Sequence, residues 1–118
     1  QYRYAYGESI YEIPAGKLDA NEDPKTAAAR ELEEEAGLKP NRLEWLFTMY
    51  PTPGYTNEKI YIYRAYDCER VAAHLDEGEF LDVEYIPLEK VKEMLKNGEI
   101  KDGKTIIALQ AYMLSEKE

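Results

Sequence analysis

Three glutamates, Glu31, Glu34 and Glu35, have the side-chain type and the spacing that could do chemistry in this sequence. Residues three and four positions apart share one face of a helix, so a helix here gathers the three carboxylates. Their mutual repulsion costs about 0.2–0.5 kcal/mol for the i,i+4 pair and calls for a cation. Arg30 can pair with Glu34, but hard divalent cations compensate better, because Mg²⁺ prefers carboxylate oxygens and keeps bound water. Taken alone, the glutamates favour a solvated acidic face.

The element that must position these carboxylates is a helix predicted over residues 26–36. Asp23 is the expected N-cap, Pro24 the first helical position and Gly37 the left-handed stop. Glu33 points away from the other three glutamates. A small apolar stripe is expected to pack on a sheet and comprises Ala28, Leu32 and Ala36.

Hydrophobic periodicity predicts further strands and helices around this helix. The expected strands are residues 1–6, 9–13, 43–50, 60–66 and 80–86, and the run 60–66 is apolar enough to be buried on both sides. The expected helices are residues 88–96, closed by Gly98, and 104–115. The pattern contains no internal repeat, low-complexity tract or linker.

Length and charge restrict the class of protein. The chain has 118 residues, of which 44% are hydrophobic, and a formal net charge of −9, which together indicate one acidic globular domain. An acidic surface repels polyanions, so nucleic acid is not expected as a partner, and no apolar run is long enough to span a membrane. With one cysteine, Cys68, and one histidine, His74, a structural zinc site is not expected and a reducing cytoplasm is the default location. We interpret Cys68 as a buried thiol and His74 as an exposed loop side chain.

A longer pattern surrounds the glutamates. Gly16 is followed after five residues by Glu22, and seven residues later comes the run Arg30–Glu31–Leu32–Glu33–Glu34–Glu35–Ala36–Gly37–Leu38. This pattern resembles the signature of the Nudix hydrolases at every specified position. The resemblance implies an α/β fold, the Nudix α/β/α sandwich with a mixed β-sheet between helices, over residues 1–118. It also implies that N-terminal strands of the family's sheet are lacking here, because Gly16 comes early in the chain.

Beyond the signature, the chain is similar to the ADP-ribose pyrophosphatase branch of this family. The cues are residues 1–3 (Gln-Tyr-Arg), residues 12–16 leading into the signature, Pro53 after it, and residues 75–80. The branch implies hydrolysis of ADP-ribose to AMP and ribose 5-phosphate. Other nucleoside diphosphate derivatives, and a catalytically silent nucleotide-binding or regulatory module, remain alternatives.

The resemblance also assigns roles to individual residues. It implies Mg²⁺, with Mn²⁺ possible, held by Glu31, Glu34 and Glu35, while Arg30 orients one glutamate and Glu22 stabilises the loop. Gly16 permits close backbone approach, so the carbonyl of Ala15 is a further candidate ligand. Glu34, Glu35 and Arg30 are the expected catalytic groups of the helix.

Outside the helix, the resemblance to this branch implies that a loop glutamate helps activate the nucleophilic water. The candidates are Glu77 and Glu79, against the alternative of a plain acidic turn at Gly78. Substrate contacts are expected from Arg3, Gly16 and Glu58, against the alternatives of a surface arginine without a contact and of an ordinary residue at the start of a strand. The expected partner is a small nucleoside diphosphate sugar, and the chain is expected to form a homodimer, since an exposed sheet edge favours self-association.

Overall fold

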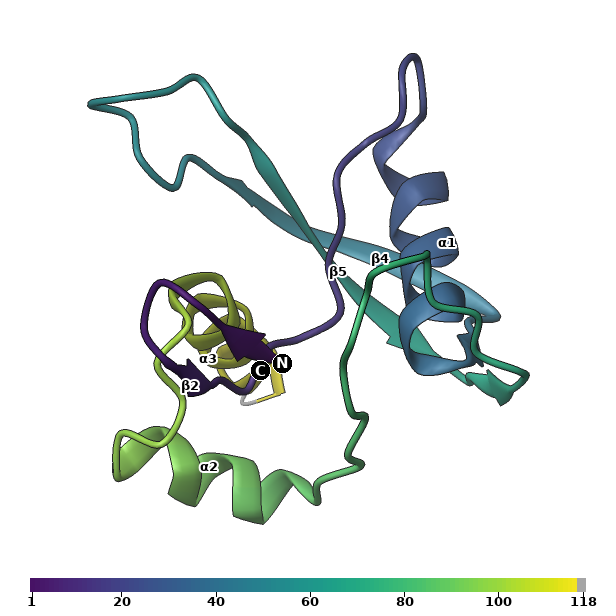
Figure 1. Cartoon of the computed structure of the whole chain (residues 1–118). Helices are drawn as coiled ribbons and strands as arrows, with labels where there is room; N and C mark the ends of the chain where they lie inside the picture. The colour runs from purple at the N-terminus through teal and green to yellow at the C-terminus, as the bar shows by residue number, and fades with distance from the viewer. Residues whose placement is uncertain (117–118) are drawn as a thin grey trace. The chain divides into compact units, whose positions relative to one another are not determined.

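A computed structural model describes residues 1–116 of the chain (Figure 1). The contacts divide it into two compact units, which we describe separately. The glutamate-helix unit is Pro14–His74, and the terminal unit consists of Gln1–Ile13 together with the chain from Leu75 onward. Within the described residues, no helix is long and apolar enough to cross a membrane. The expectation of a single domain stays a prediction.

Helix α1 (Pro24–Ala36) is the centre of the glutamate-helix unit, and its predicted ends are confirmed. The side chain of Asp23 accepts a hydrogen bond from the backbone N–H of Thr26, and Pro24 occupies the first turn, where a missing N–H costs nothing. Gly37 ends the helix with φ +64°, and its N–H donates to the Glu33 carbonyl. The buried residues of α1 are Ala27 and Glu35, whereas the predicted stripe of Ala28, Leu32 and Ala36 is only half-buried.

A long antiparallel ribbon lies against α1 (Figure 1). Strand β4 (Arg42–Met49) pairs with β5 (Ile60–Tyr66), and β3 (Leu38–Lys39) pairs with β6 (Glu69–Arg70). The two pairings are separate two-stranded sheets that keep the same register, and the break between them contains Pro40, which has no N–H to donate. The register therefore does not change from the end of α1 to the bulge between Trp45 and Phe47.

Two expectations about the sheet are corrected. Every strand pair in the described residues is antiparallel, and the strands form three two-stranded sheets rather than one mixed sheet. Strand β5 is not buried on both sides, since Ile62 is its only buried residue. The physical reason is that β5 has one strand neighbour, β4, so the ribbon lacks the flanking strands that bury a central strand.

The terminal unit begins with a short hairpin. Strands β1 (Tyr2–Arg3) and β2 (Glu8–Ser9) are much shorter than the predicted strands 1–6 and 9–13. The Arg3 carbonyl accepts from the N–H groups of Tyr6 and Gly7, so the chain turns directly after β1. The N–H of Ile13 donates to the Thr105 hydroxyl instead of to a strand.

Helices α2 (Leu88–Lys96) and α3 (Gly103–Glu116) complete the terminal unit and confirm both helix predictions to within a residue. Their buried side chains, with that of the intervening Ile100, form its small core and are Met94, Ile100, Thr105 and Ala108. The predicted strand 80–86 is wrong. These residues pair with no strand of the described chain, and Phe80 is 82% exposed, so neither a ladder partner nor a core holds them in a sheet.

Candidate active site

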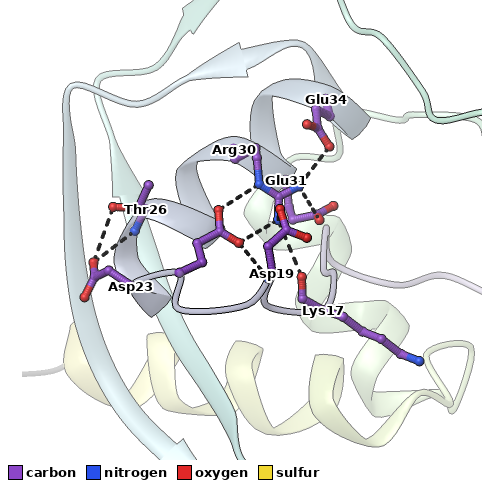
Figure 2. A network of polar contacts seen from close by, with 8 residues as sticks. Lys17, Asp19, Asp23, Thr26, Arg30, Glu31 and Glu34 are labelled. Atoms are coloured by element: carbon purple, nitrogen blue, oxygen red, sulfur yellow. Dashed lines mark hydrogen bonds and ion pairs between the residues drawn. The ribbon is translucent and has the colours of Figure 1, made fainter.

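Arg30 is the hub of the glutamate face of α1 (Figure 2). Its guanidinium donates to both carboxylate oxygens of Glu22 at 2.9 Å, to Glu31 Oε1 at 2.9 Å and to Glu34 Oε2 at 3.2 Å. Figure 2 shows the Glu31 and Glu34 carboxylates converging on this one cation from the same side of the helix. Their mutual repulsion is therefore compensated by a residue of the same helix, and the expected Arg30–Glu34 pair is confirmed.

The loop before α1 is tied to the same arginine. Glu22 also accepts a hydrogen bond from the backbone N–H of Asp19, and Arg30 Nη2 lies 3.6 Å from Asp19 Oδ2. The hydrogen bonds from Arg30, followed by that from the Asp19 N–H, lower the pKa of Glu22 to about 2. The hydrogen bonds that Arg30 donates to Glu22, and then those to Glu31, raise the pKa of Arg30 further above its ordinary value. Glu22 thus holds the loop to the helix, which supports the stabilising role expected for it.

Glu35 and Glu31 hold a second stretch of the loop, residues 15 and 16. Glu35 is only 9% exposed, and its Oε1 accepts from the N–H of Ala15 at 2.9 Å. The Glu31 carboxylate occupies the space where a Cβ at residue 16 would stand, so any larger residue at this position would displace that carboxylate. The carbonyl of Ala15 and three carboxylates therefore belong to one loop and one helix face that are in direct contact.

The donor set is suitable for a hard divalent cation, because Ala15 and the three glutamates offer oxygen ligands only. The carboxylates nevertheless have different partners. Glu31 and Glu34 accept hydrogen bonds from Arg30, whereas Glu35 accepts one from the Ala15 N–H. Across residues 1–116, no three His, Cys, Asp or Glu side chains are gathered into a ready cation site. The oxygen ligands fit Mg²⁺. For these ligands to bind one cation, Glu31 and Glu34 would have to contact both that cation and Arg30.

Arg3 lies in the terminal unit and forms a bidentate ion pair with Glu12. Its Nε and Nη2 donate to the two carboxylate oxygens of Glu12 at 2.6 and 2.7 Å. Lys104 Nζ bridges Glu12 and Asp102, at 3.0 Å from each. The hydrogen bond from Arg3, aided by Lys104, lowers the pKa of Glu12 to about 2 against the unfavourable burial. Sequence reasoning missed Glu12, Asp102 and Lys104, since 92 residues separate Glu12 from Lys104.

The loop candidates differ in their own contacts. Glu79 Oε1 accepts from the N–H of Asp76, and the Glu79 N–H donates to the Asp76 carbonyl, which closes a turn at Gly78. Glu77 is exposed at that turn. Glu58 is exposed and precedes β5, where its N–H donates to the Thr56 hydroxyl. Glu77 and Glu79 belong to the terminal unit and Glu58 to the glutamate-helix unit.

The C-terminal end of α1 carries a contact that the sequence did not reveal. Residues 71–74 cross it, and the N–H groups of Val71 and His74 donate to the carbonyls of Gly37 and Glu34. A Cβ at residue 37 would come to 2.6 Å from the Val71 carbonyl oxygen. The only sequence signal for this crossing was the glycine itself.

The two isolated residues have different outcomes. Cys68 is exposed, so its interpretation as a buried thiol is wrong. It follows Asp67, whose φ of +50° interrupts the ladder between β5 and β6, and the side chain consequently has no core to enter. His74 is exposed in a loop, as expected.

Comparison with known proteins places the chain in a family. The family model described as the NUDIX domain matches residues 1–109. A methanol dehydrogenase activator of Bacillus methanolicus is 43% identical over 98% of this chain, and an ADP-ribose pyrophosphatase of Bacillus subtilis is 36% identical over 98%. The chain spans 64% of the length of each of these relatives.

A solved structure agrees with the sequence comparison. It is described as the crystal structure of an ADP compounds hydrolase, matches 99% of this chain and 63% of its own chain, and has a TM-score of 0.88 at 26% identity. This likeness confirms the predicted α/β fold class, although the described strands pair only in twos.

Proposed function

This chain belongs to the Nudix family, and on that premise we propose that it hydrolyses the pyrophosphate bond of ADP-ribose or a related nucleoside diphosphate sugar. The products from ADP-ribose are AMP and ribose 5-phosphate. The resemblance to the family drawn from the motif is confirmed by the match over residues 1–109. The choice of ADP-ribose is supported by the named relative from Bacillus subtilis.

One observation carries the proposal: the loop before α1 is fastened to the carboxylate face of that helix. Glu35 holds the Ala15 N–H, and the Glu31 carboxylate fills the space that Gly16 leaves open. This contact brings a backbone carbonyl and several carboxylates to one surface, which a solvated acidic face has no need to do. The arrangement supports a metal-dependent reaction on a polyphosphate.

Mg²⁺ is the proposed metal, with Mn²⁺ as the alternative. The proposed ligands are the Ala15 carbonyl and the carboxylates of Glu31, Glu34 and Glu35. When bound, such a cation neutralises a pyrophosphate and lowers the pKa of a bound water. Arg30 holds Glu31 and Glu34 by hydrogen bonds of 2.9 and 3.2 Å, so a bound metal would share these two carboxylates with Arg30.

Further roles are proposed for residues outside the helix, each taken by itself. Glu77 or Glu79 accepts the proton of the attacking water, as an ionised carboxylate can. Arg3 is proposed to contact a substrate phosphate while it remains paired with Glu12. Gly16 and Glu58 are proposed to face the substrate. The partner is a small molecule, and the chain is proposed to be a homodimer, which light scattering after size exclusion tests. A cytoplasmic location stays a prediction from the single cysteine.

The test of the reaction is AMP release from ADP-ribose, followed by chromatography with and without Mg²⁺. The wild-type chain is compared with Glu35→Gln, and with Glu33→Gln as the matched control on the same helix. We expect metal-dependent AMP from the wild type and from Glu33→Gln, and a loss of at least roughly 100-fold in Glu35→Gln. AMP formation that survives EDTA, or equal loss in both variants, contradicts the proposed roles.

Substrates with another leaving group are tested with the same protein variants. If folded wild-type chain releases no AMP from ADP-ribose, other nucleoside diphosphate sugars and dinucleotides are assayed in the same way. Hydrolysis of one of these retains the reaction class and replaces the substrate. No turnover of any of them removes the enzyme proposal.

A second candidate function is a regulatory module, which the likeness to the methanol dehydrogenase activator favours. In that case the chain raises the rate of a methanol dehydrogenase. The discriminating measurement is the dehydrogenase rate with wild-type chain and with Glu35→Gln. Stimulation by both indicates that binding alone activates, whereas stimulation by the wild type only indicates that hydrolysis is needed.

A further inference from the structure

A cavity in the terminal unit is lined by residues from two separate stretches of the chain. It has a volume of about 490 Å³, and its lining includes Arg3, Glu12 and Lys104. A guanidinium carries its N–H donors in one rigid plane, and Glu12 engages those at Nε and Nη2 of Arg3. The carboxylate of Glu12 therefore fixes the plane of the Arg3 guanidinium beside the cavity.

Glu12 is itself held by a second cation. Its side chain is 11% exposed, against 45% for Arg3, so its charge depends on neighbouring cations more than on water. Lys104 Nζ lies 3.0 Å from Glu12 Oε1 and 3.0 Å from Asp102 Oδ2, and the Lys104 side chain is 19% exposed. One largely buried cation thus connects Glu12 to the residue that precedes α3.

The first turn of α3 is the fixed end of these contacts. Asp102 Oδ2 accepts hydrogen bonds from the backbone N–H and the hydroxyl of Thr105, at 3.2 and 2.6 Å, as an N-cap residue does. Thr105 is 3% exposed, and its hydroxyl accepts a hydrogen bond from the N–H of Ile13. The backbone next to Glu12 and the second partner of Lys104 are therefore attached to the same helical turn.

We propose that Glu12 and Lys104 are positioning residues, which hold the Arg3 guanidinium at this cavity in the orientation that receives an anionic group of the substrate. The inference rests on the proposed function, in which Arg3 contacts a substrate phosphate. A guanidinium that is already fixed loses little further freedom when an anion binds, so positioning raises affinity. Without Lys104, the Arg3–Glu12 pair loses its ion-pair contact with the start of α3 and can turn as a unit.

The test is the KM for ADP-ribose in the presence of Mg²⁺, measured for the wild-type chain and for Lys104→Met. We expect KM to rise by roughly 10-fold, the middle of the range for coupled side chains in direct contact. The kcat should stay near the wild-type value, because an arginine that binds substrate and transition state alike affects KM alone. An unchanged KM, or a loss confined to kcat, overturns the inference.

Lys101→Met is the matched control. Lys101 lines the same cavity, but its Nζ pairs with Glu8 at 2.9 Å, and its side chain is 62% exposed. This variant removes the same charge from the same surface and leaves the contacts of Glu12 in place. Its KM should equal that of the wild type. An equal rise of KM in both lysine variants would reflect the lost charge alone and overturns the inference.

A double-mutant cycle shows whether Lys104 acts through Arg3. Arg3→Ala is expected to raise KM, and adding Lys104→Met to it should raise KM no further. Effects that multiply would show that Lys104 acts on the substrate or on the fold directly, and an unchanged KM in Arg3→Ala would remove Arg3 from binding. Either result overturns the inference. If Lys104→Met does not fold, Glu12→Gln replaces it in the cycle with the same expected outcomes.

Failure of the proposed function is a separate result. If the folded wild-type chain hydrolyses no nucleoside diphosphate derivative, the proposed function fails, and NMR of the Arg3 side chain still tests the positioning. The Arg3 Nε–H is expected to exchange slowly with water in the wild type and in Lys101→Met, and faster in Lys104→Met. Equal exchange in all three proteins contradicts the positioning. If hydrolysis occurs and Lys104→Met keeps the wild-type KM, only the inference fails.

Discussion

At the scale of single residues, the glutamates of α1 are divided by what each carboxylate touches. Glu31 and Glu34 turn to Arg30, whereas buried Glu35 turns to the Ala15 N–H. A buried carboxylate must have hydrogen-bond partners. The bond from the Ala15 N–H therefore stabilises both the position of the loop and the burial of Glu35. The sequence spacing alone did not distinguish the roles of these three glutamates.

Gly16→Ala is expected to weaken metal binding while leaving the fold intact. The new methyl group takes the place of the Glu31 carboxylate, which is the end of a flexible side chain and can move away. We expect a fall in Mn²⁺ affinity of roughly 10- to 100-fold, the effect of disturbing the support of a metal ligand, with little change in melting temperature. Isothermal titration calorimetry and thermal unfolding measure the two.

Gly54→Ala is the matched control for that experiment. Neither Gly16 nor Gly54 has a positive φ, and a Cβ at residue 54 meets nothing within 4 Å. Its Mn²⁺ affinity should equal that of the wild type. Unchanged affinity in Gly16→Ala would show that Glu31 is not a ligand.

The ion pairs of Glu12 predict a pH dependence of stability. Arg3 first, and Lys104 second, lower the pKa of Glu12 from 4.5 to about 2 in the folded chain. A lowered folded-state pKa stabilises the fold above the unfolded-state pKa, and this contribution is lost as the pH falls from about 4.5 through about 2. Urea unfolding midpoints should therefore drop over this range more steeply in the wild type than in Glu12→Gln. An identical pH profile in Glu12→Gln would contradict the assignment, and the exposed Glu69, replaced by Gln, is the control.

At the scale of elements, α1 is defined by its two ends. Asp23 caps the first turn, and Gly37 in the left-handed region lets the chain reverse into β3 and the ladder. The same glycine leaves room for residues 71–74, since a Cβ there would approach the Val71 carbonyl to 2.6 Å. One helix end thus terminates α1, leads into β3 and accepts the N–H of Val71.

Gly37→Ala is expected to destabilise the chain more than Gly98→Ala. Both glycines have positive φ, +64° and +81°, so alanine carries a backbone cost of about 1–2 kcal/mol at either position. Only residue 37 adds a collision, since a Cβ there approaches the Val71 carbonyl to 2.6 Å, whereas nothing lies near residue 98. The free energy of unfolding from urea titration measures the difference. Equal losses would show that residues 71–74 move aside without a cost in stability.

At the scale of the whole molecule, charge controls which ligands approach. A net charge of −9 repels anions such as a pyrophosphate, and salt screens that repulsion. The proposed substrate therefore depends on cations for binding as well as for reaction.

ADP-ribose is expected to bind weakly in EDTA, and its weak affinity should rise with NaCl concentration. Added Mg²⁺ should strengthen binding far more than the same ionic strength of NaCl, because it offers a bridge between carboxylates and phosphates. Calorimetric titration at matched ionic strength makes the comparison. Tight binding in EDTA, or equal effects of the two salts, would show that metal is not needed for recognition.

Local chemistry let the sequence determine the helices and the family. Three local features depend only on neighbours within a few residues. They are the cap at Asp23, the stop at Gly37 and the helical spacing of apolar residues in α2 and α3. The signature from Gly16 to Leu38 is likewise contiguous, so its match to the family could be recognised without a structure. The glutamate face and its pairing with Arg30 followed from helical spacing alone.

Only the tertiary structure decided what distant residues do to one another. Residues 80–86 alternate like a strand but pair with no strand among residues 1–116, and β5 is apolar but lacks the neighbouring strands that would bury both of its faces. The Arg3–Glu12–Lys104 network and the His74–Glu34 bond join residues far apart in the chain. Strand pairing, burial and such bonds are properties of two segments together, and a pattern within one segment carries no information about its partner.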